Sequence, residues 1–359
     1  MKKIKIGSYT LVPYRDLSYD EWLEIRNSFG LALGGSDMSV IMGVNEYASL
    51  PMLFDQKLGL IDKANLTHNK AVFWGNRMEN IVRESSQYYD INDANSYLSN
   101  FADGNKVRNH IAFDYTIQND NIPFMFANVD GISIDASEEE VVDLVEVQGK
   151  LPIPESIIEV KTMNKHVYDK WGNEADGTKG LPIGYIYQVL AYMVQYMEMN
   201  PDIDAYIFSL VAGMDLHAYH IEYNEDIVNE MLSRAYEFNL LLQEGDDIIR
   251  NASSEAQMKR GLDEIRPEAD DSENYQQYIN KNYLDRLDIT SRALGTDEML
   301  EVARKYDEIN KKMGVLKREK TKYGNKAREF LNKLEVSQID LPDDGGVIKY
   351  NNRLIIKLK

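Results

Sequence analysis

The chain has 359 residues and no cysteine, and its 59 Asp and Glu against 40 Lys and Arg give a formal net charge of −19. The lack of cysteine excludes disulfides, thiolate nucleophiles and cysteine-bound zinc or iron–sulfur clusters, so a metal would need oxygen or histidine ligands. No apolar run approaches the roughly 18 residues of a membrane span and no signal peptide is evident, so we expect a cytoplasmic protein with no membrane partner.

The charge is unevenly distributed along the chain. Residues 301–359 carry 15 Lys and Arg against 9 Asp and Glu, a net +6, while residues 1–300 carry 25 against 50, a net −25. A basic C-terminal arm is typical of a solvated helix and equally of a DNA-contacting one, because phosphate contacts need a local surplus of cations. The sequence leaves both interpretations open.

The first third of the chain is predicted to be mainly helical. Helical spacing and a glycine stop predict a helix over Tyr19–Gly30, and Ser36 is placed to cap a short helix whose N–H groups would suit a phosphate. Further helices are predicted near Pro51–Leu58 and over about 69–89, and the second carries Glu79 beside its apolar side.

Strands dominate the next segment. They are predicted over His110–Ile117, Pro123–Asp135 and Ser156–Met163, with a further candidate strand over 141–148. Asp130 lies where an apolar alternation breaks before Gly131, a position from which a strand end offers a carboxylate to a cleft. Glu159 and Lys161 are two apart, so both project from one face of their strand.

The remaining elements are a helix over 182–200, a hairpin over 205–223, an amphipathic helix from Glu225, a long heptad-like helix over 297–334 and a hairpin with an Asn351–Asn352 turn. On the helix over 182–200, one face carries Tyr185, Gln188, Tyr192 and Gln195. We expect three parts: a core over 1–245, an acidic irregular or helical connector over 246–296, and a coiled-coil-like helix with a β-hairpin over 297–359.

Polar residues on four predicted elements suggest one shared site. Glu79 lies on a helix, Asp130 at a strand end, Glu159 and Lys161 on a strand, and Gln188 on a helix. Two carboxylates and a backbone carbonyl can hold a hard divalent cation, and a lysine beside them can orient or deprotonate a water and offset phosphate charge. This set suits phosphodiester hydrolysis.

The same order resembles the PD-(D/E)xK nuclease superfamily. Within it, the run R…GGSD…W-G-N-x-x-E…VDG…EVKT…YxxQVLAYM is similar to the YqaJ-type viral recombinase and phage lambda exonuclease family over roughly residues 25–223. The resemblance implies an α/β (α+β) fold with a restriction-endonuclease-like core, in which helices flank a central mixed sheet.

The resemblance also implies roles for the residues around the strand over 156–163. Asp130 and Glu159 would bind Mg²⁺, or Mn²⁺ in its place, with the Val160 carbonyl as a further ligand. Glu79 would contribute through water or to a second ion. Lys161 would activate the attacking water.

By the same resemblance, Gln188 would position water or phosphate, and Arg26 with the Ser36 region would hold a 5′-terminal phosphate. Glu146 is a rival to Glu159, because it lies at a more usual distance from Asp130. We prefer Glu159, since Val147 and Gln148 follow Glu146 and leave it without a paired lysine.

The function that the resemblance implies is a Mg²⁺-dependent 5′→3′ exonuclease on double-stranded DNA ends, which exposes 3′ single strands for phage-type recombination. A homo-oligomer, most simply a trimer, and a single-strand annealing protein would be its partners. An endonuclease of the same fold, of repair or restriction type, and a DNA-binding or assembly module without catalysis are the alternatives.

Overall fold

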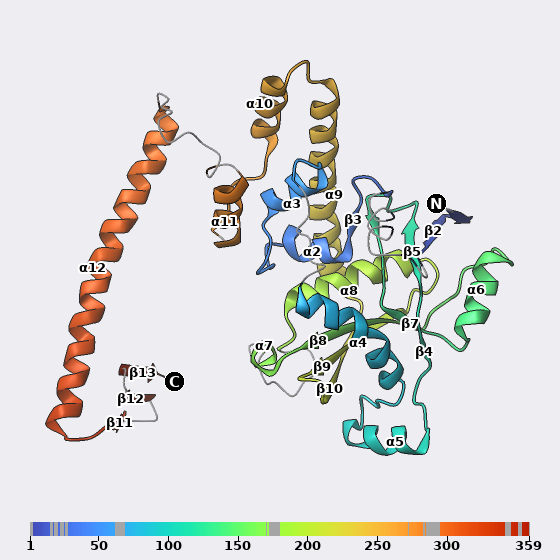
Figure 1. Cartoon of the computed structure of the whole chain (residues 1–359), viewed down its shortest axis with the longest axis horizontal. Helices are drawn as coiled ribbons and strands as arrows, with labels where there is room; N and C mark the ends of the chain where they lie inside the picture. Colours follow the sequence, from blue (N-terminus) through green and yellow to red (C-terminus); the bar gives the residue numbers. More distant parts are fainter. Residues whose placement is uncertain are drawn as a thin grey trace. The chain divides into compact units, whose positions relative to one another are not determined.

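The computed structural model describes the following residues: 3–14, 17, 21, 25, 28–61, 69–169, 171, 180–271, 273–282, 284, 295–341, 346–350 and 354–358. It divides into two compact units, residues 1–286 and residues 287–359, and each is described by itself (Figure 1). Within the described ranges, every helix is too short or too polar to cross a membrane.

A five-stranded mixed sheet forms the centre of the first unit. Its strands lie in the order β10–β9–β8–β7–β4; β8 and β9 are parallel, and the other pairs are antiparallel. The strands are β4 (His110–Ile111), β7 (Gly131–Ser133), β8 (Ser156–Met163), β9 (Asp204–Val211) and β10 (Asp215–Ile221). Parallel neighbours need a crossover connection, and α8 (Ile183–Tyr196) supplies it between β8 and β9.

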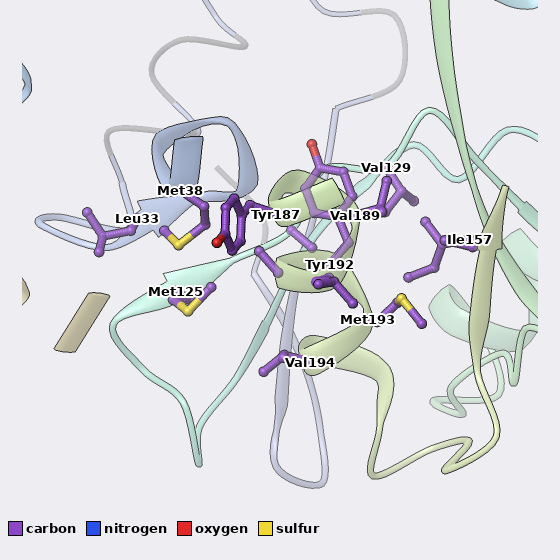
Figure 2. Packing of buried hydrophobic residues seen from close by; sticks show 14 of the residues in the cluster. Leu33, Met38, Met125, Val129, Ile157, Tyr187, Val189, Tyr192, Met193 and Val194 are labelled. Atoms are coloured by element: carbon purple, nitrogen blue, oxygen red, sulfur yellow. The ribbon is translucent and has the colours of Figure 1, made fainter. Parts of the chain in front are cut away.

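Helices cover both faces of this sheet (Figure 1). On one face, Val82 of α4 (Lys70–Ser86) packs with Ile158 and Val160 of β8. On the other, Ile157 belongs to the main core with Val189, Met193 and other residues of α8, as Figure 2 shows. Successive residues of β8 therefore face opposite layers, as the period of a strand requires.

The other helices of this unit surround the sheet. They are α2 (Gly35–Ile41), α3 (Leu50–Lys57), α5 (Tyr97–Asp103) after a 3₁₀ turn (Ala94–Ser96), α6 (Glu138–Glu146), α7 (Lys165–Tyr168), α9 (Glu225–Asn251), α10 (Glu255–Ile265) and α11 (Glu273–Asn282). The mixed sheet flanked by helices confirms the expected fold class.

Two small sheets lie beside the central one. β1 (Ile4–Ile6), β2 (Tyr9–Pro13) and β5 (Tyr115–Asn119) are antiparallel, and β3 (Leu33–Gly34) pairs with β6 (Met125–Phe126) in parallel.

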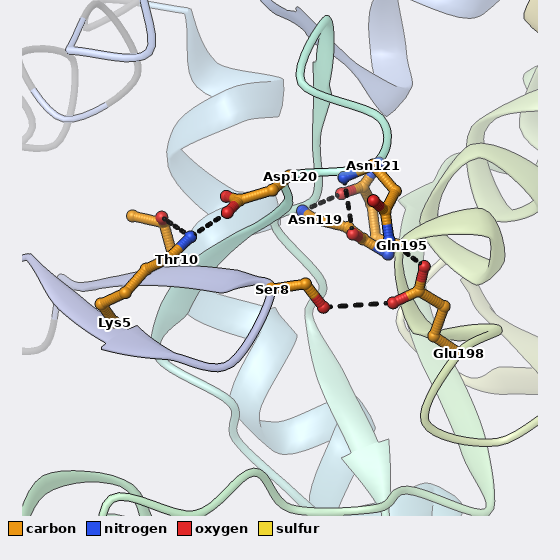
Figure 3. Close-up of polar contacts among 8 residues, drawn as sticks. All are labelled: Lys5, Ser8, Thr10, Asn119, Asp120, Asn121, Gln195 and Glu198. Carbon is orange, nitrogen blue, oxygen red and sulfur yellow. Dashed lines mark hydrogen bonds and ion pairs between the residues drawn. The ribbon is translucent and has the colours of Figure 1, made fainter.

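Polar contacts hold the three-stranded sheet to the end of α8 (Figure 3). Ser8 Oγ donates to Glu198 Oε2 over 3.2 Å, Asn121 Nδ2 donates to the other oxygen of Glu198, and the Asn119 N–H donates to Gln195 Oε1 over 2.7 Å. Gln195 thus has a structural role, although it shares the polar stripe of α8 with Gln188.

Several predicted elements differ from the structure. The possible strand over 141–148 is wrong, because this segment forms α6, with Val141 and Val145 buried on one side. The two long strands over 110–117 and 123–135 are each divided into two short strands that belong to different sheets. Ser36 does not cap α2: Gly34 is the N-cap residue, and the Asp37 side chain accepts from the Gly34 N–H over 2.8 Å.

The segment after α9 is more helical than irregular. α10 and α11 follow α9, and a buried carboxylate on α3 anchors them. Asp55 is 0% exposed; its Oδ2 accepts from Arg266 Nη1 over 2.7 Å and from the Tyr278 hydroxyl. The helix predicted over 19–30 and the Asn351–Asn352 turn fall largely or wholly outside the described residues.

The second unit consists of a long helix and a small sheet. The helix is α12 (Asp297–Lys333), and the antiparallel strands are β11 (Gln338–Asp340), β12 (Gly346–Tyr350) and β13 (Leu354–Leu358). α12 packs on this sheet, where Ala327 and Leu331 are buried and a Cβ on Gly324 would lie 3.5 Å from Leu354 Cδ2. The long helix and the hairpin strands confirm the prediction for this part.

Candidate active site

Glu159 and Lys161 lie together on the α8 side of β8. Glu159 is 2% exposed, and its Oε1 accepts from Lys161 Nζ and from Gln188 Nε2, the latter over 2.7 Å. Lys161 Nζ also lies 3.4 Å from Gln188 Oε1. The structure therefore joins three of the predicted site residues in one hydrogen-bonded group.

Aromatic side chains of α8 hold this group in place. Gln188 shares a hydrogen bond of 2.9 Å between its Nε2 and the Tyr192 hydroxyl, and Lys161 Nζ lies 4.9 Å from the centre of the Tyr185 ring. A cation over an aromatic face is stabilised by the ring quadrupole. Tyr185 and Tyr192 thus restrict the positions of the lysine and the glutamine.

Asp130 joins this group from the end of the neighbouring strand. It directly precedes β7, and its Oδ2 accepts from the Val160 N–H over 2.8 Å. The N–H and C=O of one strand residue point toward the same neighbour. The Val160 carbonyl therefore faces the same side as the Asp130 carboxylate.

Arg83 connects Asp130 to Glu79 and was not predicted. Its Nη1 donates to the Asp130 carbonyl oxygen over 2.7 Å and lies 3.5 Å from Glu79 Oε1, one helical turn away on α4. A Cβ on Gly131 would lie 2.6 Å from Arg83 Cδ and 2.8 Å from the Ile111 carbonyl oxygen, and because the backbone cannot move aside easily, this position requires glycine. The i, i+4 spacing of Glu79 and Arg83 was the available sequence signal.

Burial and mutual repulsion perturb the acids. Burial and, after it, the Asp130 carboxylate raise the pKa of Glu159 to about 8, against the opposing effect of Lys161. Burial likewise raises the pKa of Glu79 to about 8, with Asp130 acting in the same direction and Arg83 against it. Burial also raises the pKa of Asp130, which Lys161 partly offsets. The three carboxylates thus interact with one another; Glu159 is buried, whereas the Glu79 side chain is 35% exposed and reaches solvent.

The lysine keeps its proton in this setting. Burial alone would lower the pKa of Lys161, but Glu159 and Asp130 together outweigh it and raise the pKa above its ordinary value. Lys161 is therefore an ammonium at neutral pH, and its charge opposes the rise in the pKa of Glu159 and of Asp130.

The donor set fits a hard divalent cation. Glu159 Oε2 is buried and has no hydrogen-bond partner among the described residues, although buried polar atoms are normally paired. Asp130, Glu159 and the Val160 carbonyl supply oxygen atoms, the donor type that Mg²⁺ and Mn²⁺ prefer. Across the described ranges, no three His, Asp or Glu side chains form a ready metal-ligating group, so the fit rests on Asp130, Glu159 and the Val160 carbonyl, with Glu79 nearby.

The other predicted site residues lie elsewhere or outside the description. Ser36 is exposed on α2. The residue before it, Gly35, is the first of this helix and packs against α8, because a Cβ on Gly35 would lie 2.9 Å from the Gln188 carbonyl oxygen. Arg26 lies outside the described residues. Glu146 is exposed at the end of α6 and accepts from the Tyr115 hydroxyl over 3.1 Å.

Residues 21–195, which include the whole of this acid and lysine group, match the model of the YqaJ-like viral recombinase domain. These residues form a YqaJ-like viral recombinase domain. The protein is also 24% identical over 224 residues to the uncharacterized protein YqaJ of Bacillus subtilis (strain 168), a match that covers 62% of this chain and 56% of that protein. The chain thus matches little more than half the length of this curated relative.

Two solved structures are similar to part of this chain. One is an alkaline exonuclease, LHK-Exo, from Laribacter hongkongensis, with 16% identity, a TM-score of 0.41, and 64% of this chain and 96% of that chain covered. The other is a phage-related exonuclease from Haemophilus somnus 129PT, with 14% identity, a TM-score of 0.35, and 63% and 98% covered.

Proposed function

We propose that the protein is a divalent-metal-dependent exonuclease that hydrolyses phosphodiester bonds of double-stranded DNA in the 5′→3′ direction. The observation that carries the proposal is the buried Glu159–Lys161 pair beside Asp130 at the end of β7. A purely structural ion pair would not need two further carboxylates of raised pKa next to it.

Each residue has a role that its contacts support. Asp130, Glu159 and the Val160 carbonyl would hold the cation, and Glu79 would contribute through water or to a second ion. A bound Mg²⁺ would polarise the scissile phosphate and lower the pKa of a water. Lys161, held as an ammonium between Glu159 and Tyr185, would donate to the attacking water or to a phosphate oxygen.

Gln188 and Arg83 would hold the acids of the site in position. Gln188 fixes Glu159 Oε1 through its Nε2 and would position water or phosphate. Arg83 fixes the backbone at Asp130 and balances Glu79. Neither residue needs to change its protonation state for this purpose.

The direction of cleavage would come from recognition of the DNA end. Arg26 and the Ser36 region would hold a 5′-terminal phosphate, because an arginine can bind a phosphate with two hydrogen bonds. A ring-shaped homotrimer would confine the DNA despite the net negative charge, and a single-strand annealing protein would receive the product. Light scattering of the protein with DNA tests the oligomer, and a monomer at micromolar concentration would contradict it.

Digestion of three DNA substrates side by side tests the proposal: 5′-phosphorylated linear, 5′-hydroxyl linear and closed circular duplex, each with Mg²⁺. We expect the phosphorylated linear DNA to be degraded fastest and the circular DNA to survive. Cleavage of the circle would instead identify an endonuclease. No turnover with either Mg²⁺ or Mn²⁺ would identify a DNA-binding module, and a chain carrying Glu159→Gln is the inactive control.

A further inference from the structure

The second half of α12 concentrates positive charge in an acidic protein. Residues 311–333 contain nine Lys and Arg against two Asp and Glu, whereas residues 1–300 carry a net charge of −25. All nine cationic side chains are exposed. This segment is therefore a local source of positive potential.

Four of these cations form a stripe along one face of the helix. Arg318, Lys322, Lys326 and Lys333 are separated by four, four and seven residues. At about 100° per residue, they fall within an arc of roughly 80°. We call these four residues the basic stripe.

The small sheet of the second unit leaves the basic stripe accessible. The helix packs on that sheet through Gly324, Ala327 and Leu331. On the same helical projection, the centre of the basic stripe lies roughly 180° from this packed face. Within the second unit, the stripe therefore faces away from the strands.

The basic stripe also lacks acidic partners in the part of the chain that the structure describes. The ion pairs of α12 lie in its first half, where Lys305, Lys311 and Lys312 each pair with an acid four residues earlier. Within the described residues, none of the four stripe cations has a carboxylate oxygen within 4.0 Å. Glu329 lies within the same arc, three residues after Lys326 and four before Lys333, so this face carries a net charge of +3; no ion pair of 4.0 Å or less joins Glu329 to the stripe among the described residues. Like charges four residues apart on a helix repel one another, and a bound anion relieves this cost.

We propose that the basic stripe binds the phosphate backbone of duplex DNA away from its ends. The stripe spans 15 residues, or about 23 Å of helix, which corresponds to roughly seven base pairs at 3.4 Å each. The regularly spaced phosphates of DNA can face the cations of the basic stripe. Because Lys and Arg contacts to phosphates carry no sequence preference, the stripe would bind DNA of any sequence. The inference rests on the proposed function in taking DNA as the substrate, and it adds a second contact surface outside the catalytic domain.

Binding to a DNA that has no ends tests the basic stripe separately from the active site. The probe is a fluorescent dumbbell duplex of about 30 base pairs closed at both ends, in EDTA, with anisotropy measured against the full chain at several salt concentrations. We expect Arg318→Gln, Lys322→Gln and Lys326→Gln combined to weaken binding at least about tenfold and to lower the salt-dependence slope by about 3.

A matched control variant distinguishes the effect of where the charges lie from the effect of how many there are. Lys317→Gln, Lys320→Gln and Arg328→Gln combined remove the same three charges from other positions of the same helix segment. This variant should bind nearly as well as the unaltered chain, and Lys322→Arg with Lys326→Arg should keep full binding. Circular dichroism melts check that both triple variants keep the helix.

Three outcomes would overturn the inference: equal loss in both triple variants, no loss in the stripe variant, or no binding of the dumbbell by the unaltered chain at 50 mM salt. Capture of anionic vesicles without dumbbell binding would also overturn it in favour of a membrane surface. Cleavage of linear DNA is measured in a separate assay. A chain that binds the dumbbell through the stripe but cleaves nothing would refute only the proposed function.

Discussion

We expect the buried carboxylate of Glu159 to make the stability of the protein depend on pH and on a bound divalent cation. Its pKa of about 8 in the folded protein exceeds the ordinary value of 4.5, so the folded state holds more protons than the unfolded state between these values. The contribution of Glu159 to the free energy of unfolding is therefore fully present below about pH 4.5 and is lost as pH rises through 8.

The informative window begins at pH 6.5. Below that pH a second buried group acts in the opposite direction: burial and the neighbouring Arg108 and Arg83 lower the pKa of His110 to about 3, so stability from His110 is lost as pH falls. From pH 6.5 to pH 8, one Glu159 proton at 1.36 kcal/mol per pH unit gives up to about 2 kcal/mol, and Glu79, whose pKa is also raised to about 8, acts in the same direction. At about 2–4 °C per kcal/mol, the Glu159 contribution alone should lower Tm by roughly 4–8 °C.

Thermal melts in EDTA across this window, followed by circular dichroism, measure the effect. Mg²⁺ or Ca²⁺ at about 100 times Kd should then restore about 2.7 kcal/mol at pH 8, because a ligand of the folded state stabilises it. Glu159→Gln cannot titrate, so its Tm should depend less on pH and should no longer respond to metal. A Tm of the unaltered chain that is flat from pH 6.5 to 8 and insensitive to both cations would refute this account of the site.

Three further predictions concern the cleavage reaction. Asp130→Asn should reduce the cleavage rate at least about a hundredfold, in line with a loss of roughly 3 kcal/mol of transition-state stabilisation. Glu146→Gln should cleave at nearly the normal rate. The reverse pattern in initial rates would show that the metal-binding acid was assigned wrongly. Lys161→Ala should abolish cleavage yet keep DNA binding in Ca²⁺, and a filter-binding assay that shows equal loss of both would make Lys161 a binding residue. Arg26→Ala should erase the preference for 5′-phosphorylated ends while leaving residual metal-dependent cleavage, which a comparison of the two linear substrates checks.

The sequence predicted the elements whose pattern reflects their own packing. β8 has the expected bounds within a residue, and Glu159 and Lys161 share a face because a strand alternates strictly. α8 was equally clear, since its apolar positions recur at helical spacing. These patterns are local, so one sequence is enough to find them.

The errors arose where short apolar runs fit two structures. Val141, Val142, Leu144 and Val145 can be read as a strand, but Val141 and Val145 are one helical turn apart and both are buried. Ser137 and Glu140 form a capping box just before them, a helix signal that was present in the sequence. The partition of 110–135 among three sheets had no local signal, because pairing partners far along the chain determine it.

The sequence predicted several of the residues that meet at the candidate site, but not all of their supports. Arg83 contacts Asp130 and Glu79 from a position that periodicity alone assigns to a helix surface. Tyr192, by contrast, was already on the polar face of its helix with Gln188. Their roles follow from which side chains meet in space. A single sequence, without an alignment of homologues, does not contain that information.

The anchoring of α10 and α11 by Asp55 bears on how the nuclease part could be produced alone. A fragment that ended at residue 245, at the limit of the predicted core, would end inside α9 and would lack Arg266 and Tyr278, the two donors to the Asp55 carboxylate. The helices α10 and α11 would be lost with these donors, so such a fragment should be less stable than the whole unit. A fragment that ends after Arg286 keeps both donors, so fragments for crystallisation should end there and not at the end of the catalytic motifs.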